Sequence, residues 1–285
     1  MLRKVFLLFA CLCAAMAGSG LLATAFRAAP SATRPPQRIV SLNLCADQLV
    51  LALADRRQIA GLTRNAVDTQ MSAEAARARG LPILTHSAEQ ILAIGPDLVA
   101  GMPARGNAVL MGLDRDVRAL DLESADRLGD IYRSIRTTAA AVGHRDRGEA
   151  MIARMQRELA DLPRPGAGRV AAYYQRRGFM TGTGTLIDDL MQRMGLVNLA
   201  AKLGKPALAQ VSLEEMVAAR PDFLIVESAT DRITDQGSEM LHHPALRDIP
   251  RISIPQAWTV CGGPSYARAA RSMADQITRL DGAHR

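Results

Sequence analysis

The feature that most constrains this chain is a repeated motif, which reads SAEQILAIGPD at residues 87–97 and SLEEMVAARPD at residues 212–222. The two copies share Ser, Glu, Ala, Pro and Asp in register. Each ends in Pro-Asp, which starts an apolar segment, DLVAG after the first copy and DFLIVE after the second. The succession of a helix, a turn and a strand is common in proteins, so the motif indicates an internal repeat only if its surroundings repeat as well.

The surroundings of the motif do repeat. A β-branched segment precedes each copy, RIVSLN at residues 38–43 and GRVAAYY at residues 168–174, and an apolar helix pattern follows each segment. Strands are expected at 38–43, 58–62, 82–85, 97–101, 169–174, 196–199, 222–227 and 251–254, and helices at 45–55, 72–79, 88–94, 185–194, 212–219, 238–247 and 264–280. This alternation predicts an α/β fold of two similar lobes, each with a central parallel sheet flanked by helices.

The N-terminus reads as a targeting segment. It begins MLRK, continues with an apolar run and reaches small residues at Ala23-Thr24-Ala25, which predicts a cleaved signal peptide over residues 1–25. A retained membrane anchor is the alternative, but Gly18-Ser19-Gly20 interrupts the apolar run. Pro-rich residues 26–36 are expected to form an extended leader. We therefore expect the protein to be secreted across the inner membrane, and the family resemblance given below places it in the periplasm.

The segment between the lobes, residues 123–162, carries apolar residues at helical spacing and is divided by Gly143. A helix of about fifteen residues ending near Leu162 would span roughly 22 Å. No Gly/Ser-rich linker occurs here. The N-terminal lobe at 37–122 and the C-terminal lobe at 163–285 are thus expected to be joined rigidly, with a small rocking motion rather than a large hinge closure.

Composition limits the possible partners. The formal net charge is +7 and aromatic residues make up 4% of the chain, with no basic stripe of interleaved aromatics. Nucleic-acid binding is therefore not expected. Positive charge outside the cytoplasm favours an anionic ligand.

Taken together, these features resemble the periplasmic substrate-binding proteins of ABC importers, in particular the cobalamin and ferric-siderophore group. The resemblance covers nearly all of the chain after residue 36. It implies two lobes joined by a long helix, with a cleft between them that captures a small-molecule metal chelate. The implied protein is a monomer without enzymatic activity or a cofactor of its own.

The resemblance also implies a partner, an inner-membrane permease dimer. Its arginines would receive Glu89 from one lobe and Glu214 from the other, a pairing that fixes orientation and assists encounter. The same glutamates are also explained by helix capping, because Ser87 and Ser212 precede them and a first turn favours negative charge. The two interpretations are compatible.

Ligands of parallel sheets gather at the carboxyl ends of strands, so the loops there supply the candidate site. The expected ligand-binding residues are Cys45, Arg64, Arg105, Arg176, Phe179, Trp258, Cys261 and Tyr266. The arginines, with Arg177, favour the carboxylates of a ferric chelate, whereas the large, nearly neutral cobalamin would favour aromatic walls. Trp258 matches a cleft Trp of the cobalamin binders, or else packs under its own lobe. The sequence departs from those binders at a second cleft Trp, because Leu208 stands near that place.

Cys45 and Cys261 lie on loops of opposite lobes, and three arrangements are open. They form a disulfide if their Cα atoms come within ~7 Å. Alternatively they contact the ligand or its metal, or they remain unpaired thiols.

Two other functions compete with the receptor. A two-lobed extracytoplasmic enzyme, such as a metal chelatase or a thiol-dependent hydrolase, needs a base near its nucleophile, and no His neighbours Cys45 or Cys261 in the sequence. A heme or free-metal carrier needs clustered His, Tyr or carboxylate ligands, and the sequence shows no such cluster. We therefore expect a chelate receptor.

Overall fold

The computed structural model describes residues 34–85, 87–101, 117–233 and 235–283. The predicted signal peptide, most of the predicted leader, and Arg105 lie outside the described residues. Among the described residues, no helix is both long enough and apolar enough to cross a membrane.

The first sheet contains the strands in the order β2-β1-β3-β4, all parallel. Its strands are β1 (Ile39–Ser41), β2 (Ile59–Gly61), β3 (Leu98–Gly101) and β4 (Arg118–Asp121), and its helices are α1 (Leu44–Leu53), α2 (Ala75–Ala78) and α3 (Ala88–Ile94). Ile39 belongs to the large core cluster on one face and Val40 to a small cluster with Leu84 and Ile91 on the other. Burial on both faces explains the continuous apolar segments of this sheet.

The second sheet is mixed rather than parallel, in the order β10-β9-β5-β6-β8, with β7 also paired to β5. Its strands are β5 (Val170–Tyr174), β6 (Phe179–Thr181), β7 (Val197–Asn198), β8 (Leu208–Gln210), β9 (Phe223–Glu227) and β10 (Arg251–Ile254). β6 runs antiparallel to both β5 and β8. The helices around it are α6 (Leu186–Arg193), α7 (Leu199–Lys202), α8 (Leu213–Ala219), α9 (Gln236–Glu239) and α10 (Tyr266–Ala283). The expected central parallel sheet is present in β10, β9, β5 and β7, and β6 and β8 add an antiparallel edge that the sequence did not predict.

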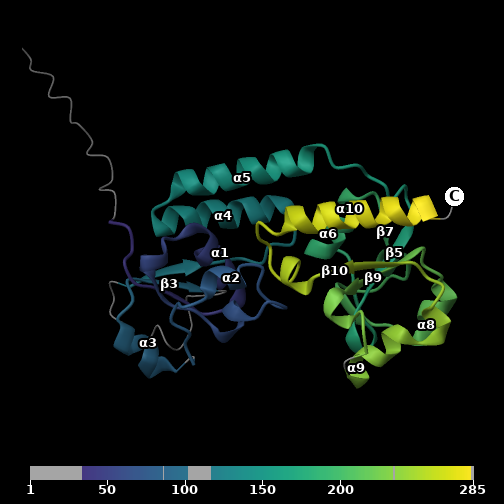
Figure 1. Cartoon of the computed structure of the whole chain (residues 1–285), viewed down its shortest axis with the longest axis horizontal. Coiled ribbons are helices and arrows are strands. Elements are labelled where there is room, and N and C mark those ends of the chain that lie inside the picture. The colour runs from purple at the N-terminus through teal and green to yellow at the C-terminus, as the bar shows by residue number, and fades with distance from the viewer. Residues whose placement is uncertain (1–33, 86, 102–116, 234, 284–285) are drawn as a thin grey trace, which may run out of the picture. The chain divides into compact units, whose positions relative to one another are not determined.

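Two helices connect the sheets, α4 (Leu128–Val142) and α5 (Arg145–Ala160), and they lie side by side (Figure 1). Gly143 ends α4 with a φ of 87°, which confirms the predicted break. A Cβ atom at Gly148 of α5 would stand 2.6 Å from the Cβ atom of Ala139 of α4. Glycine at this position therefore allows the close approach of the two helices.

One core cluster includes residues from both sheets and from the connecting helices, among them Ile39 of β1, Ile135 of α4, Met155 of α5 and Tyr173 of β5. A second cluster, around Tyr174, covers the opposite face of the second sheet. The shared core means that the sheets are connected by packing as well as by the chain, which supports a stiff connection.

Three expected elements differ from the structure. The helix expected at 238–247 is divided into α9 and two 3-10 turns, Met240–His242 and Pro244–Leu246, since a proline lacks the N–H that a helix interior needs. The helix expected at 72–79 is reduced to α2, and the strand expected at 82–85 to a bridge between Leu62 and Ile83.

Candidate functional site

The two copies of the repeated motif adopt the same structure in α3 and α8. The Ser87 hydroxyl accepts a hydrogen bond from the Gln90 N–H at 3.1 Å, and the Ser212 hydroxyl accepts one from the Glu215 N–H at 3.1 Å. Each serine thus satisfies a backbone donor that the first helical turn leaves without an intrahelical partner. The predicted caps are confirmed.

Glu89 and Glu214 occupy the same position in these two helices, in the exposed first turn. Hydrogen bonds from its own backbone N–H and from the Ser212 hydroxyl lower the pKa of Glu214 below its usual range. Glu214 is therefore ionised at neutral pH. The structure presents one exposed carboxylate from each copy of the motif.

The Pro-Asp ends of the motif have a structural role. The Asp97 carboxylate accepts a hydrogen bond from the Arg38 N–H at 2.9 Å, and the Asp222 carboxylate accepts one from the Val170 N–H at 2.7 Å. In each case the aspartate N–H donates back to the carbonyl of the same partner. Each aspartate thus anchors the start of the neighbouring strand, which explains why the strand, helix and Pro-Asp repeat together.

Cys45 and Cys261 form a disulfide with their Cα atoms 5.3 Å apart. Cys45 lies in the first turn of α1, and Cys261 is buried between the 3-10 turn Gln256–Trp258 and α10. Of the three arrangements left open by the sequence, the structure therefore contains the covalent bridge between lobes. A disulfide sulfur is not a thiolate, so this geometry does not support direct contact with a metal or thiol-dependent catalysis.

The arginines after the strands have different surroundings. Arg176 forms an ion pair with Asp235, with 2.8 Å between Nη1 and Oδ2. Arg64 is exposed in the 3-10 turn after β2 and makes no ion pair with the described residues. Arg177 has a φ of 59°, and Arg105 lies outside the described residues. Since Arg176 already has a carboxylate partner, it gives less support to binding of an anionic ligand.

An exposed apolar face lies at the edge of the second sheet. In the β6–β8 pair, Phe179 is opposite Gln210 and Thr181 is opposite Leu208, so these four side chains share one face. Phe179 is 38% exposed and Leu208 is 58% exposed. The Gln175 N–H donates to the Phe179 carbonyl at 2.7 Å, which places this face beside the carboxyl end of β5. The position suits the apolar wall of a ligand site.

A set of polar side chains lies at the same end of the sheet, and we call it the Glu227 cluster. It consists of Tyr173, Gln175, Thr181, Glu227 and Thr259. Oε1 of Glu227 accepts from the Gln175 amide at 3.0 Å and faces the Tyr173 hydroxyl at 3.4 Å. The Thr181 hydroxyl donates to the Gln175 amide oxygen at 3.0 Å. The order of residues along the chain did not predict this cluster; its one signal is the acidic residue that closes the apolar strand FLIVE.

The Tyr173 hydroxyl stays protonated within this cluster. The pKa of Tyr173 is raised well above its usual range, mainly by burial and secondly by the nearby Glu227 carboxylate. Tyr173 is 3% exposed. A protonated phenol next to the carboxylate can donate to it, and it does not add a second negative charge.

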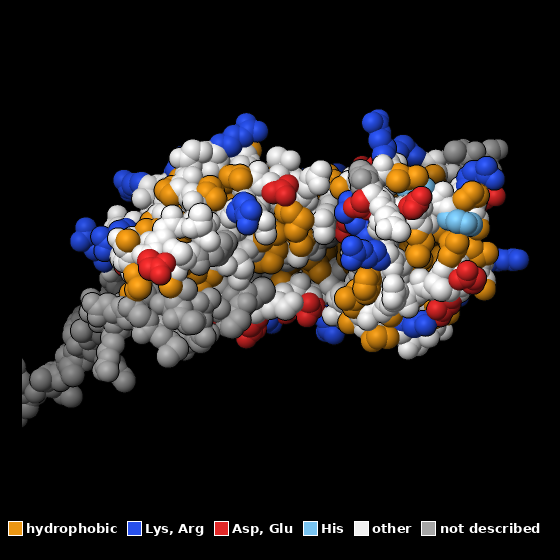
Figure 2. Space-filling model, turned by 90° about the horizontal axis from the view of Figure 1, so that it is seen from below, with side chains coloured by type: hydrophobic (Ala, Val, Ile, Leu, Met, Phe, Trp, Pro, Cys, Tyr) orange, Lys and Arg blue, Asp and Glu red, His pale blue; other side chains and the backbone are white. Residues whose placement is uncertain are grey.

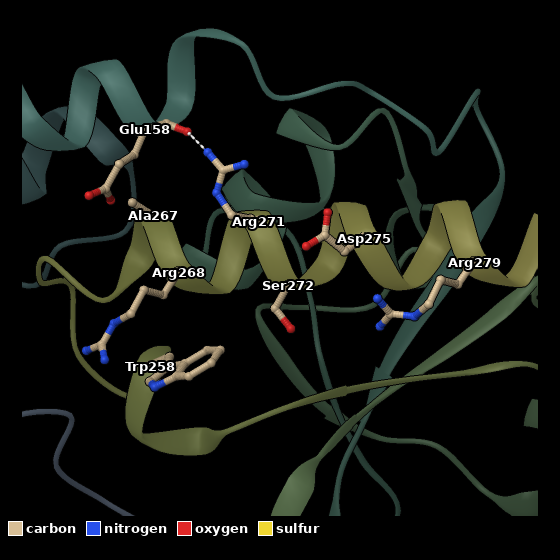
Figure 3. A pocket seen from close by; sticks show the side chains of 8 residues that line it. All are labelled: Glu158, Trp258, Ala267, Arg268, Arg271, Ser272, Asp275 and Arg279. Atoms are coloured by element: carbon tan, nitrogen blue, oxygen red, sulfur yellow. Dashed lines mark hydrogen bonds between the residues drawn. The ribbon is translucent and has the colours of Figure 1, made fainter.

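Trp258 lies elsewhere, beside a cavity of about 580 Å³ that follows α10 and includes Glu158 of α5 in its lining (Figure 3). The Arg268 guanidinium lies over its ring, 5.5 Å from the centroid. Arg271 on α10 donates to the Glu158 carbonyl on α5 at 2.9 Å. The Trp258 ring is half-buried against the large core cluster. This position favours the interpretation that Trp258 packs under its own lobe, although the next residue, Thr259, belongs to the Glu227 cluster.

Tyr266 is also part of the core. It is 1% exposed at the start of α10, and its hydroxyl donates to Asp189 and accepts from Arg193 of α6. Burial raises the pKa of Tyr266 well above its usual range. Because its hydrogen bonds are satisfied inside the protein, this placement does not support the expected ligand contact.

The surface on the side away from α4 and α5 has apolar side chains in a hollow near its middle, with acidic and basic side chains beside it (Figure 2). Within the described ranges, no group of three or more His, Cys, Asp or Glu side chains is arranged to hold a metal ion.

Comparisons with known proteins agree with this architecture. A family model described as "Periplasmic binding protein" matches residues 39–252. A cobalamin-binding protein of Halobacterium salinarum is 22% identical over 213 residues, covering 72% of this chain and 58% of that relative. An uncharacterised ABC transporter substrate-binding lipoprotein, YvrC of Bacillus subtilis, is 22% identical over 264 residues, covering 86% of this chain and 81% of that relative.

Among solved structures, the periplasmic heme-binding protein RhuT of Roseiflexus sp. RS-1, in its apo form, is similar with a TM-score of 0.67 and 25% identity. The match covers 85% of this chain and 98% of the heme-binding protein. The similarity therefore extends over both sheets and the helices between them.

Proposed function

Because this chain belongs to the periplasmic binding protein family, which serves cobalamin, heme or siderophore-type ligands, we propose that it is an extracytoplasmic receptor for a metal chelate. The chelate is held at the carboxyl ends of the strands, between the two lobes, and is delivered to an ABC import permease. The observation that carries this proposal is the matched pair Glu89 and Glu214, exposed in equivalent first turns of α3 and α8.

The matched glutamates fit a two-fold symmetric partner. A permease dimer offers two equivalent surfaces, and a receptor with one carboxylate in each lobe can meet both in a single orientation. Capping explains why a serine and an acidic residue occur at each helix start. It does not explain why both carboxylates are exposed and form no ion pair with a described lysine or arginine. The related YvrC carries the description of an ABC transporter component, which supports this step.

The carboxyl end of the second sheet supplies chemistry that suits a large chelate. Phe179 and Leu208 present exposed apolar surface, and Gln175 and Glu227 present polar groups close to it. A mostly apolar wall with a few placed polar groups is typical of ligand sites. Cobalamin, heme and ferric siderophores all combine a broad framework with polar groups at the periphery.

Members of this family are solute-binding transport proteins and not enzymes. The disulfide between Cys45 and Cys261 also leaves neither sulfur available as a nucleophile. The chelatase and hydrolase alternatives are therefore set aside.

The remaining expectations form part of the proposal. Residues 1–25 are a cleaved signal peptide, residues 26–36 a leader, and the receptor works as a monomer in the periplasm. The lobes comprise residues 37–122 and 163–285, with residues 123–162 between them.

Uptake by cells tests the proposal. The gene for this chain is deleted from its host, and the uptake of labelled cobalamin, heme and ferric hydroxamate is compared with that of the complemented strain. We expect the uptake of one of these chelates to fall at low external concentration and to return on complementation. Unchanged uptake of all three would contradict the proposed function.

A further inference from the structure

Glu227 is a nearly buried carboxylate without a cationic partner. It closes β9, is 6% exposed, and forms no ion pair with a described Lys, Arg or His side chain. Charged side chains are seldom buried to this extent unless they are paired, because the loss of hydration costs several kcal/mol. The described side chains therefore supply no cation opposite Glu227.

The hydrogen bonds of Glu227 leave one oxygen open. The Gln175 amide and the Tyr173 hydroxyl both approach Oε1, and no described donor reaches Oε2. Among the described residues, the fully buried polar side-chain atoms without a hydrogen-bond partner are Nε2 of Gln48 and Oγ1 of Thr138. Oε2 of Glu227 is not among them although it has no partner, so it is not fully buried. Oε2 is thus an acceptor that no described group occupies and that keeps some contact with solvent.

The neighbours of Glu227 hold the carboxylate in place. Tyr173 is fixed in the core, and Gln175 is oriented by the Thr181 hydroxyl. A carboxylate held by oriented donors on one oxygen presents its other oxygen in a defined direction. Such an arrangement recognises a hydrogen-bond donor at one defined position of the ligand, rather than attracting any positively charged molecule.

The position of Glu227 is that of a ligand-binding group. It lies at the carboxyl end of a central strand, where ligands of such sheets gather. Gln175 joins it to the strand pair that carries the exposed Phe179 and Leu208. A chelate packed on that apolar face would bring its periphery to the Glu227 cluster.

We propose that Glu227 is a specificity-determining residue that accepts hydrogen bonds from N–H groups at the edge of the chelate. It thereby selects a neutral chelate that carries amides over one that carries carboxylates. This inference rests on the proposed function and narrows its ligand class. A ligand carboxylate at this position would meet Glu227 as a like charge, and an open buried acceptor without a donor carries a desolvation penalty.

Calorimetric titration with four chelates tests the inference. Cyanocobalamin and the ferric hydroxamate ferrichrome are neutral and carry amide N–H groups, whereas hemin and ferric citrate carry carboxylates. We expect the wild-type protein to bind one of the neutral chelates at least about tenfold more tightly than either carboxylate chelate. Glu227→Gln keeps the shape of the side chain and removes its charge, so it should weaken that binding about tenfold.

Two further variants complete the experiment. Glu123→Gln makes the same charge change at an exposed side chain whose contact with Arg133 is 4.0 Å long, and it should leave affinity unchanged. Gln175→Met removes one donor to Glu227 and should weaken binding of the neutral chelate by a smaller factor, which supports the inference even if Glu227→Gln fails to fold.

The outcomes separate the inference from the proposed function. If the wild-type protein prefers hemin or ferric citrate, the receptor function stands and the role of Glu227 is overturned. Equal affinity of the wild-type protein and a folded Glu227→Gln variant for the neutral chelate also overturns that role. If none of the four chelates binds, the proposed function fails, and the inference fails with it.

Discussion

Cys45 is bonded to Cys261 over a sequence separation of 216 residues. The bond joins the start of α1, after the first strand of one sheet, to the loop after β10, the last strand of the other. The large core cluster also extends from β1 through α4 and α5 to β5. A covalent bond and a continuous core thus connect the same two lobes, which supports a small rocking motion between them.

The disulfide is expected to stabilise the protein considerably because the loop it closes is long. Replacement of both Cys45 and Cys261 by Ser should lower the free energy of unfolding by about 3 kcal/mol, measured by chemical denaturation. Reduction of the wild-type protein should have a similar effect. Two free thiols in denatured, unreduced protein would show that the bridge is absent in solution.

The paired glutamates are expected to act in delivery and not in ligand binding. Glu89→Ala combined with Glu214→Ala should strongly reduce transport in proteoliposomes that contain the cognate permease, while chelate affinity stays unchanged. Glu215→Ala is the matched control, since Glu215 lies in the same first turn but pairs with Lys205 at 2.8 Å. Full transport by the double variant would exclude the docking role.

The aspartates of the motif are expected to contribute to stability. Asp222→Ala removes the acceptor for the Val170 N–H and should cost about 1 kcal/mol of unfolding free energy. Asp222→Asn keeps a carbonyl oxygen at this position and should lose less. Equal losses from the two substitutions would argue against the hydrogen bond as the cause.

The end of α3 offers a test of backbone conformation. Gly95 has a φ of 58°, so Gly95→Ala should destabilise the protein by about 1 kcal/mol. Gly129→Ala, inside α4 with no atom within 4 Å of the added Cβ, should be neutral or stabilising because alanine favours helices. If the two variants have equal stability in thermal unfolding, the left-handed conformation of Gly95 is incorrect.

The helices and strands with clear signals at both ends could be predicted closely from the sequence. The expected helix at 88–94 matches α3, and the expected strand at 251–254 matches β10. Both are delimited by local signals, a capping serine and a glycine for the helix and flanking prolines for the strand. Local chemistry of this kind acts over a few residues and is visible in one sequence.

The second sheet was harder to predict because its edge has little burial to produce a pattern. β6 and β8 are three residues long, and Leu208 is exposed rather than buried. β8 has no buried residue and β6 has only Met180, so neither segment shows enough alternation to detect.

The candidate site was predicted only in part for a similar reason. The Glu227 cluster joins residues from β5, β6, β9 and the turn after β10, which are far apart in sequence. Tyr266 follows a strand in the sequence, yet its hydroxyl turns inward to Asp189. Which loop residues face a ligand depends on tertiary packing, which the spacing of residues along the chain does not show.

Calorimetric titration of the purified, processed protein with cobalamin, heme and ferric hydroxamate most directly tests the central claim that it is a chelate receptor. The account predicts saturable binding of one chelate molecule per protein, for one of these three ligands. The absence of saturable binding for all three would contradict the account.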